Sequence, residues 1–220
     1  MANTIEVHYV DHMGDDLSTV NAARVSFNKQ SDYDWSDLNE IKLRQRDVSL
    51  IKYLAKHKHT SPFGHAFASF HVKAPIFVHS QLLKHKFLRA NTVSRRYVDE
   101  EPEFYKPSVW RGRSADKKQG SEGEVVSTFS IDFYNEKAFQ AYDQLLNDGV
   151  APEQARMVLP QNTMTEWRWS GSLDAFADMC ILRLKDDTQY ESRLVAHRID
   201  EEMGDLFPVS WAALVRGDAT

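Results

Sequence analysis

The sequence predicts an α+β fold in which helices predominate. Most periodic segments repeat their apolar residues every three or four positions, as helices do, and only a few short segments alternate apolar with polar residues, as strands do. The strands also lack the regular strand–helix–strand order that builds a parallel sheet. The chain has 220 residues, 42% of them hydrophobic, and no repeat or linker, so a single domain over residues 1–220 is expected.

Three segments are expected to be strands because apolar and polar residues alternate along them, as in a half-buried strand. They span residues 5–10, 67–72 and 164–168.

Seven further segments have helical spacing of their apolar residues. Pro75 suits the first turn of one of them, the turn residues 61–64 end another, and Gly149 suits a third as its C-terminal stop. The expected helices span residues 16–25, 38–57, 75–87, 127–147, 152–158, 173–184 and 188–203.

Between these elements, residues 100–123 are polar and charged and are expected to form a long loop. Phe104, Tyr105 and Trp110 would anchor this loop, because aromatic side chains in a polar segment tend to pack against the body of the protein.

The composition limits the functional classes. A formal net charge of -5 argues against a general nucleic-acid-binding protein, and a single cysteine excludes a disulfide framework. There is no basic-then-apolar leader pattern and no apolar run of about 20 residues, so no membrane is expected and a cytoplasmic location is expected. Cys180 lies in an apolar helical stretch, where a thiol usually serves as core packing.

Residues 84–97 are the most distinctive stretch, because six of these fourteen residues are Lys, Arg or His in an acidic chain. Such a cluster is either a solvated surface or a phosphate site. The apolar segment 74–78 directly upstream favours delivery of the cations from a buried element. No Gly-x-Gly-x-x-Gly or Walker motif is present, so side chains would have to hold any phosphate.

Two arginines, Arg156 and Arg183, occur among apolar neighbours. A buried arginine needs an anionic partner, either an internal carboxylate or a ligand phosphate, and the sequence leaves both open. His57, His59 and His65 lie close together in sequence, but their spacing across Pro62 does not form one helix face, so no metal site is expected.

Taken in order, these segments resemble the flavin-dependent thymidylate synthases, the ThyX family. The family signature Arg-His-Arg-x-x-Ser-x-Asn-Glu-x-Ser-x-Arg-Tyr aligns with residues 84–97. Further matches are Ala-Ala-Arg-Val-Ser at 22–26, His-Thr-Ser-Pro-Phe-Gly-His at 59–65, Ala-Pro-Ile-Phe-Val at 74–78, Gln-Gly-Ser at 119–121, Ala-Arg-x-x-Leu-Pro at 155–160 and Gln-x-Glu at 189–191. The resemblance implies a ThyX-like fold with helices packed around a small, mainly antiparallel sheet.

The chain departs from the family pattern inside the signature. The two arginines that flank His85 in the family are Lys84 and Lys86 here, and Arg89 and Thr92 replace a Ser and a Glu. Outside the signature, Gly64 replaces a Glu, and Ser172 and Asp174 align with a flavin-contacting Asn and Arg. Lysine keeps the charge of arginine but loses its planar, two-pronged donor, so a divergent member with weaker flavin binding is expected.

The resemblance implies reductive methylation of dUMP to dTMP, with FAD as cofactor and NADPH and methylenetetrahydrofolate as co-substrates, in a homotetramer with shared active sites. The implied catalytic residues are His59, Ser94 and Arg183. The implied cofactor-binding residues are Lys84, His85, Lys86, Arg89, Asn91 and Ser172. The implied substrate-binding residues are Gln81, Thr92, Ser94, Arg96, Arg156 and Arg183.

Three alternatives stay open at this point. A sibling enzyme could make a hydroxymethyl product or act on dCMP, since Thr92 replaces the family Glu near the nucleotide. A nucleotide- or flavin-binding protein without catalysis would fit the changes at Gly64 and Asp174. A helical interaction domain would explain the helical periodicity but not the ordered motifs.

Overall fold

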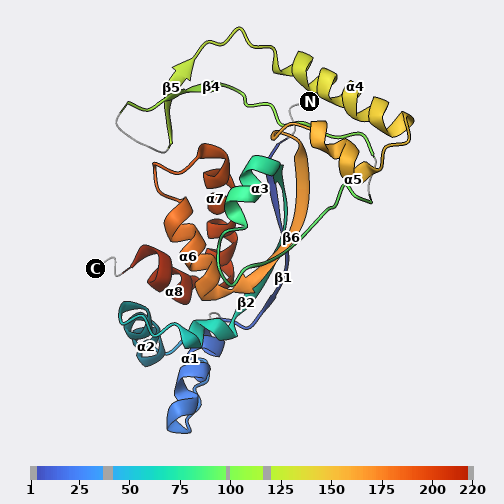
Figure 1. Cartoon of the computed structure of the whole chain (residues 1–220). Helices are drawn as coiled ribbons and strands as arrows, with labels where there is room; N and C mark the ends of the chain where they lie inside the picture. The colour runs from blue at the N-terminus through green and yellow to red at the C-terminus, as the bar shows by residue number, and fades with distance from the viewer. Residues whose placement is uncertain (1–3, 37–41, 98–99, 116–119, 218–220) are drawn as a thin grey trace.

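The computed structural model describes residues 4–36, 42–97, 100–115 and 120–217. An antiparallel sheet with strand order β1-β2-β6-β3 forms its centre (Figure 1). These strands are β1 (Glu6–Met13), β2 (Phe67–Pro75), β3 (Arg89–Thr92) and β6 (Met164–Ser172). The expected α+β class with a small antiparallel sheet is therefore confirmed.

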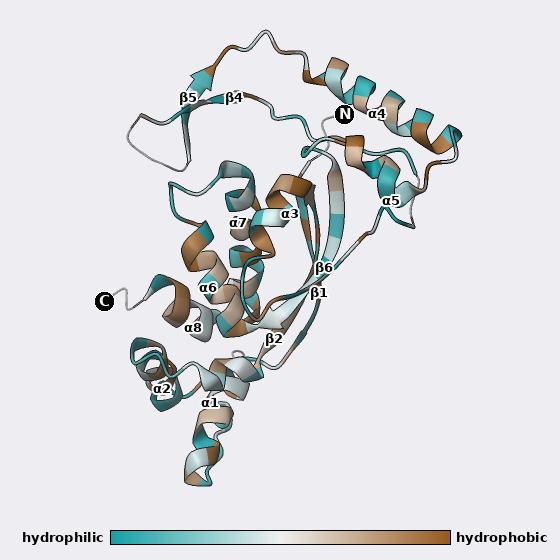
Figure 2. Ribbon diagram, viewed as in Figure 1, coloured by the Kyte–Doolittle hydropathy of each residue, from teal (hydrophilic) through white to brown (hydrophobic). Residues whose placement is uncertain are grey.

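Alternation along the strands separates a core face from an outer face. In the β2–β6 pair, Phe70 lies opposite Trp169 and Val72 opposite Trp167, and all four side chains are buried. The residues between them are polar and face away: Ser69 and Ser170 share a hydrogen bond of 2.8 Å, and His71 contacts Glu166 at 2.7 Å. Figure 2 shows the same change of hydropathy from residue to residue along β6.

Helices cover the core face of the sheet (Figure 1). They are α3 (Ile76–Leu82), α6 (Leu173–Arg183) and α7 (Tyr190–Leu206). In α6, Phe176 packs edge-on against both Phe70 and Trp169, and Cys180 is fully buried with its thiol facing the Ala196 carbonyl of α7. Burial raises the pKa of the Cys180 thiol well above its usual range. The prediction that Cys180 is core packing is therefore confirmed.

Two helices far apart in the sequence, α1 (Asp16–Arg24) and α8 (Pro208–Trp211), lie together at the lower end of the sheet (Figure 1). Helix α1 begins after Asp15, whose side chain caps it in a capping box with Ser18. Asp16 is buried and accepts hydrogen bonds of 2.8 Å from the backbone amides of Val209 and Ser210, where the short helix α8 begins. The N-terminal helix thus holds the C-terminal segment in place.

The remaining helices are α2 (Gln45–Lys56), α4 (Ile131–Asn147) and α5 (Pro152–Ala155). Several expected helices begin or end differently, among them the helix expected at 152–158, of which only Pro152–Ala155 is α-helical. Residues 42–44 precede α2, and residues 38–41 of that expectation lie outside the described residues. Helix α3 ends at Leu82, so the whole basic run of residues 84–97 follows the helix. Helices α4 and α7 begin later than expected, at Ile131 and Tyr190.

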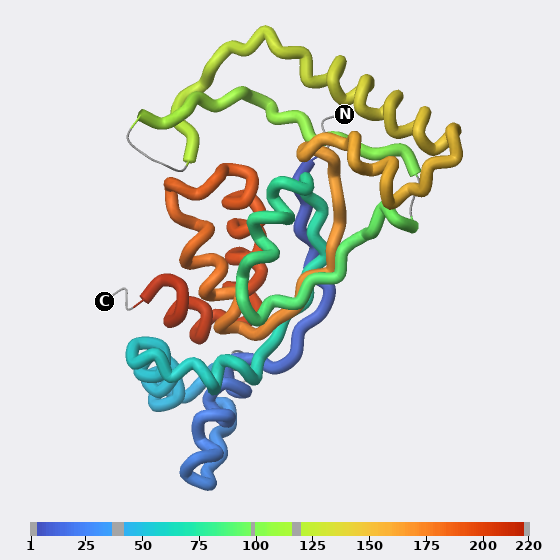
Figure 3. The backbone as a smooth tube through the Cα atoms, in the orientation of Figure 1, coloured from blue at the N-terminus to red at the C-terminus, as the bar shows by residue number. Residues whose placement is uncertain are grey.

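The largest error of the sequence prediction is the expected loop at 100–123. It contains β4 (Trp110–Arg113), which pairs antiparallel with β5 (Ser121–Val125). We call these two strands the β4–β5 ribbon. These strands show no apolar alternation in the sequence, because β5 is exposed along its whole length, β4 is only partly buried, and neither needs an apolar face. We call the three helices that cover the sheet, α3, α6 and α7, the helical layer. Figure 3 shows the segment from the ribbon through α4 passing over one end of this layer.

None of the helices within the described ranges is long and apolar enough to cross a membrane.

Candidate functional site

Two cavities meet at Arg183, near the C-terminal end of α6. The main cavity, about 890 Å³, lies between the helical layer and the β4–β5 ribbon, and Gln81 and Lys84 also line it. The second, about 350 Å³, is lined by Lys84, His85, Lys86 and Phe87 together with α6 residues. Lys84 and Arg183 line both cavities. We call the larger cavity the main cavity and the smaller one the adjoining cavity.

The Arg183 guanidinium is held by neutral groups. Its Nε donates a hydrogen bond of 2.9 Å to His85 Nε2, and one Nη donates to the Gln81 carbonyl at 3.4 Å. Within the described chain Arg183 makes no ion pair, so the internal salt bridge considered from the sequence is not formed. Its positive charge therefore stays available to an anionic or polar ligand in either cavity.

His85 is held in its neutral form. Burial, and then the neighbouring Arg183 charge, lower the pKa of His85 to about 4. Since Nε2 accepts the Arg183 hydrogen bond, the ring proton must reside on Nδ1. The pairing fixes both the tautomer of His85 and the direction of Arg183.

Gln81 is oriented in a similar way. Its side-chain oxygen accepts a short hydrogen bond from the hydroxyl of Ser192, a fully buried residue in the first turn of α7. The amide nitrogen of Gln81 is consequently left as a donor toward the main cavity. The family resemblance points to Gln81, whereas Ser192 carries no local signal in the sequence.

Thr92 and Arg156 lie elsewhere, at a third cavity of about 340 Å³. The Thr92 hydroxyl hydrogen-bonds to His79 Nε2 at 2.8 Å, and burial lowers the pKa of His79. Arg156 is exposed, with Nε donating to the Glu153 carbonyl at 3.2 Å, so the expectation that it is embedded among apolar groups is wrong. Within the described chain it makes no ion pair either.

Other predicted residues line none of these three cavities. Ser94 and Arg96 occupy an exposed turn, where Arg96 Nε donates to Ser94 Oγ at 3.3 Å. Arg89 and Asn91 lie on β3 beside β6, and Ser172 directly precedes α6. His59 is exposed and its ring stacks on Tyr53, 6.1 Å between centroids. One copy of the chain does not bring the predicted residues into one site.

Comparison with known proteins accounts for the ordered set of motifs. Residues 8–209 match the family model described as "Thymidylate synthase complementing protein". The flavin-dependent thymidylate synthase of Thermus thermophilus is 40% identical over 210 residues, covering 94% of this chain and 74% of the relative. That of Kosmotoga olearia is 36% identical over 215 residues, covering 95% of this chain and 89% of the relative.

This chain belongs to the flavin-dependent thymidylate synthase family.

A solved structure is similar over nearly the whole length. It is a UMP/dUMP methylase, PolB, from Streptomyces cacaoi, bound with 5-Br dUMP. It is 29% identical with a TM-score of 0.81, and the match covers 98% of this chain and 96% of PolB. The family resemblance is confirmed, and the thymidylate synthase prediction is supported over its alternatives.

Two features of this thymidylate synthase family member shape the basic run. Phe87 has a φ of +64°, a conformation that costs energy for a residue with a side chain. Residues 87 and 88 then cross β6 at Gly171, where an added Cβ would lie 3.1 Å from the Phe87 carbonyl oxygen and 2.4 Å from Leu88 Cδ2. Gly171 therefore permits the close passage of Phe87 and Leu88 over β6, directly after the residues that line the adjoining cavity.

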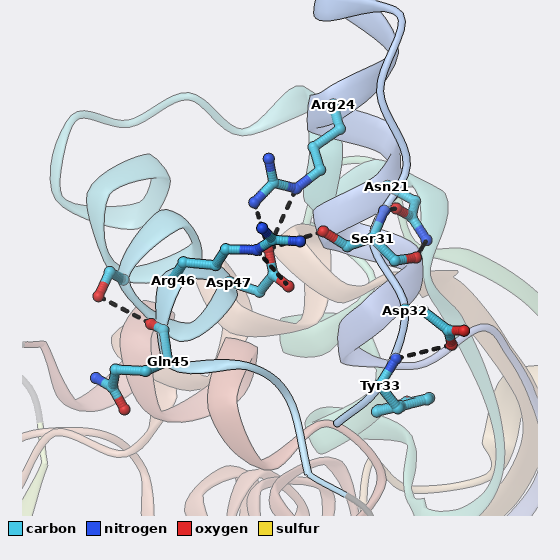
Figure 4. A network of polar contacts seen from close by, with 9 residues as sticks. Asn21, Arg24, Ser31, Asp32, Tyr33, Gln45, Arg46 and Asp47 are labelled. Atoms are coloured by element: carbon cyan, nitrogen blue, oxygen red, sulfur yellow. Dashed lines mark hydrogen bonds and ion pairs between the residues drawn. The ribbon is translucent and has the colours of Figure 1, made fainter. Parts of the chain in front are cut away.

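The family segment at 22–26 is anchored by a buried network (Figure 4). Arg24 donates to the Asp47 carboxylate through two nitrogens, and Ser31 donates to the same oxygen at 2.9 Å. Asp47 is fully buried. Arg24 is thus a structural residue that ties the end of α1 to the start of α2.

A cluster of polar and charged side chains that the sequence did not predict lies on the wall of the main cavity. Arg111 of β4 forms an ion pair with the buried Glu191 of α7 and lies over the Tyr190 ring, 4.4 Å from its centroid. Tyr105 donates to Glu191 at 3.4 Å, and burial, then the Glu191 charge, raise the pKa of Tyr105 to about 12. The matched Gln-x-Glu motif pointed to Glu191, but nothing in the sequence linked it to Arg111.

Proposed function

We propose that this protein catalyses the reductive methylation of dUMP to dTMP, with methylenetetrahydrofolate as the one-carbon donor and FAD reduced by NADPH as the source of hydride. The observation that carries the proposal is the placement of Arg183 between the main and adjoining cavities, held only by neutral partners. A guanidinium in this position can donate to the pyrimidine or phosphate of a nucleotide from one side and lie beside a flavin on the other.

The main cavity suits a pyrimidine nucleotide. Gln81 offers its amide donor, and Lys84 and Arg183 offer cationic donors, on the wall opposite the ribbon. Its volume of about 890 Å³ lies within the range of small-molecule sites. These groups would bind and orient the substrate and exclude water from it.

The residues around the adjoining cavity fit an anionic flavin nucleotide. Lys84 and Lys86 are exposed and form no ion pair within the described chain, so their ammonium groups can neutralise a diphosphate. His85 presents a neutral ring. Asp178, also on the lining, is the one unfavourable charge, and burial raises the pKa of this carboxyl. When bound, FAD would supply the redox chemistry, and these residues would orient it.

A homotetramer with shared active sites is part of the proposal. Four predicted substrate residues do not line the main cavity of their own chain, so a neighbouring copy would have to contribute them: Thr92, Ser94, Arg96 and Arg156. Three large apolar side chains that follow Lys86, Arg96 and Arg156 in the sequence are strongly exposed, and a neighbouring copy would cover them. Phe87 is 77% exposed, Tyr97 79% and Met157 76%.

The function test is a product assay. The purified protein is incubated with dUMP, methylenetetrahydrofolate and NADPH, and the nucleotide product is identified by mass. A gain of one methyl group supports the proposal, whereas a hydroxymethyl product, or no turnover by a yellow protein that binds dUMP, contradicts it. Size measurement in solution tests the tetramer.

A second candidate is methylation of UMP. The structural neighbour PolB is a UMP/dUMP methylase, and its similarity spans both chains almost completely. The same assay with UMP in place of dUMP decides between a deoxynucleotide-specific enzyme and one that accepts both sugars.

A further inference from the structure

The β4–β5 ribbon supplies one wall of the main cavity, and a small set of contacts joins it to the helical layer. From the ribbon side the cavity is lined by Trp110, Arg111 and Ser121, and from the opposite side by Gln81, Arg183 and Glu191. The shape of the cavity therefore depends on where the ribbon sits relative to the first turn of α7.

Arg111 is the centre of this attachment. Its Nε donates a hydrogen bond of 2.9 Å to Ser121 Oγ, which ties β4 to β5. One of its Nη atoms donates to the Glu191 carboxylate, and its guanidinium carbon lies 4.4 Å from the centroid of the Tyr190 ring, a cation–π contact. One side chain thus connects both strands of the ribbon with α7.

Two further observations place the ribbon firmly at this point. The Glu191 side chain is only 5% exposed, so its negative charge depends on Arg111 for compensation. At the start of β5, a Cβ added to Gly120 would lie 3.0 Å from the carbonyl oxygen of Asp187, in the loop that leads into α7. The backbone of the ribbon approaches the body closely only because Gly120 has no side chain.

We propose that Arg111 and Glu191 are positioning residues for the nucleotide: their ion pair holds the β4–β5 ribbon against α7 and keeps the main cavity formed before substrate binds. This inference rests on the proposed function in so far as the main cavity binds dUMP. A pre-formed wall raises affinity because the cost of ordering it is met during folding and not during binding.

The experiment compares Arg111→Ala, Glu191→Ala and the double variant with the wild-type protein. Two quantities are measured: the dissociation constant for dUMP by calorimetry, and backbone hydrogen exchange of residues 110–113 and 121–125. Arg111→Lys and Glu191→Gln, which keep part of the contact, serve if an alanine variant fails to fold. Arg193→Ala is the matched control, because Arg193 lies near the same Tyr190 ring and pairs with Asp186 but does not line the cavity.

Each single alanine variant is expected to raise the dissociation constant about 10- to 100-fold and to speed exchange in the ribbon. The double variant should bind dUMP no more weakly than the single variant with the larger loss, because Arg111 and Glu191 act through one contact. The dissociation constants of Arg111→Lys and Glu191→Gln should lie between those of the wild-type protein and the alanine variants. The dissociation constant of Arg193→Ala should stay within about twofold of the wild-type value.

Unchanged affinity in both single variants overturns the inference, whatever the exchange data show. Weaker binding with wild-type exchange in the ribbon also overturns it, because the two residues would then contact the ligand and not position the wall. If the wild-type protein itself does not bind dUMP, the proposed function fails, and wild-type ribbon exchange in the variants would separately reject the positioning role.

Discussion

Two arginines in this molecule, Arg24 and Arg183, are held in opposite ways. Arg24 donates to a fully buried carboxylate, Asp47, which Ser31 also contacts, so its charge is compensated within the protein. Arg183 is held by the neutral ring of His85 and by a backbone carbonyl. The first arrangement fixes two helices relative to each other, and the second fixes the direction of a cation while leaving its charge for a ligand.

The largest effect is expected on stability, at the first arginine. Arg24→Ala should lower the free energy of unfolding by about 3–5 kcal/mol, because the fully buried Asp47 charge loses its close ion-pair partner and keeps only the Ser31 hydrogen bond and Arg46 Nε at 3.9 Å. Chemical denaturation measures this. The reverse change, Asp47→Ala, should cost less, since Arg24 is partly exposed and can reach water. Equal losses in the two variants would mean that burial of Asp47 does not dominate the network.

Binding should suffer most at the second arginine. Arg183→Ala should weaken dUMP binding by about 2–4 kcal/mol, about 30- to 1,000-fold, because a charge-assisted contact is lost. The free energy of unfolding should change little, since no buried charge is left unpaired. Calorimetry and denaturation on the same preparation test both statements. A stability loss as large as that of Arg24→Ala, with unchanged dUMP affinity, would make Arg183 structural as well.

Acid should reveal the partner of Arg183. His85 has a pKa of about 4 in the folded protein, below its ordinary value near 6.5, so only the unfolded chain takes up this proton between those values. The contribution of His85 to stability is therefore complete above pH 6.5 and is lost as the pH falls toward 4.

His85→Asn is expected to reduce this loss of stability in acid. Asp178 and the lysines at the adjoining cavity are common to both proteins, so the difference between their two stability profiles isolates His85. Parallel profiles from pH 7 to 4 would show that the His85 ring is not held neutral.

The smallest effect is expected at the cysteine. Cys180→Ala should keep at least half of the turnover and cost about 1 kcal/mol of stability, because the thiol is core packing and burial keeps it protonated. A steady-state assay under the product-assay conditions measures it. Complete loss of turnover in a folded Cys180→Ala protein would indicate a cysteine nucleophile.

The sequence by itself determined the local elements and the chemistry of individual groups. Alternation predicted the strands around Phe70 and Trp167, helical spacing placed Cys180 in the core, and the density of cations in residues 84–97 predicts a ligand-binding stretch. These features depend on neighbours a few positions apart, which periodicity records. The β4–β5 ribbon escaped because its exposed strands carry no apolar alternation.

Only the tertiary structure decided which groups act together. Arg183 meets His85 across 98 positions, Ser192 orients Gln81 across 111, and Arg111 reaches Glu191 across 80. The fold also places Thr92 and Arg156 at a different cavity from Gln81 and Arg183, although the family resemblance assigns all four to one substrate site. Such pairings follow from how the sheet, the helical layer and the ribbon pack, and one residue's local sequence carries no information about a partner brought near by packing.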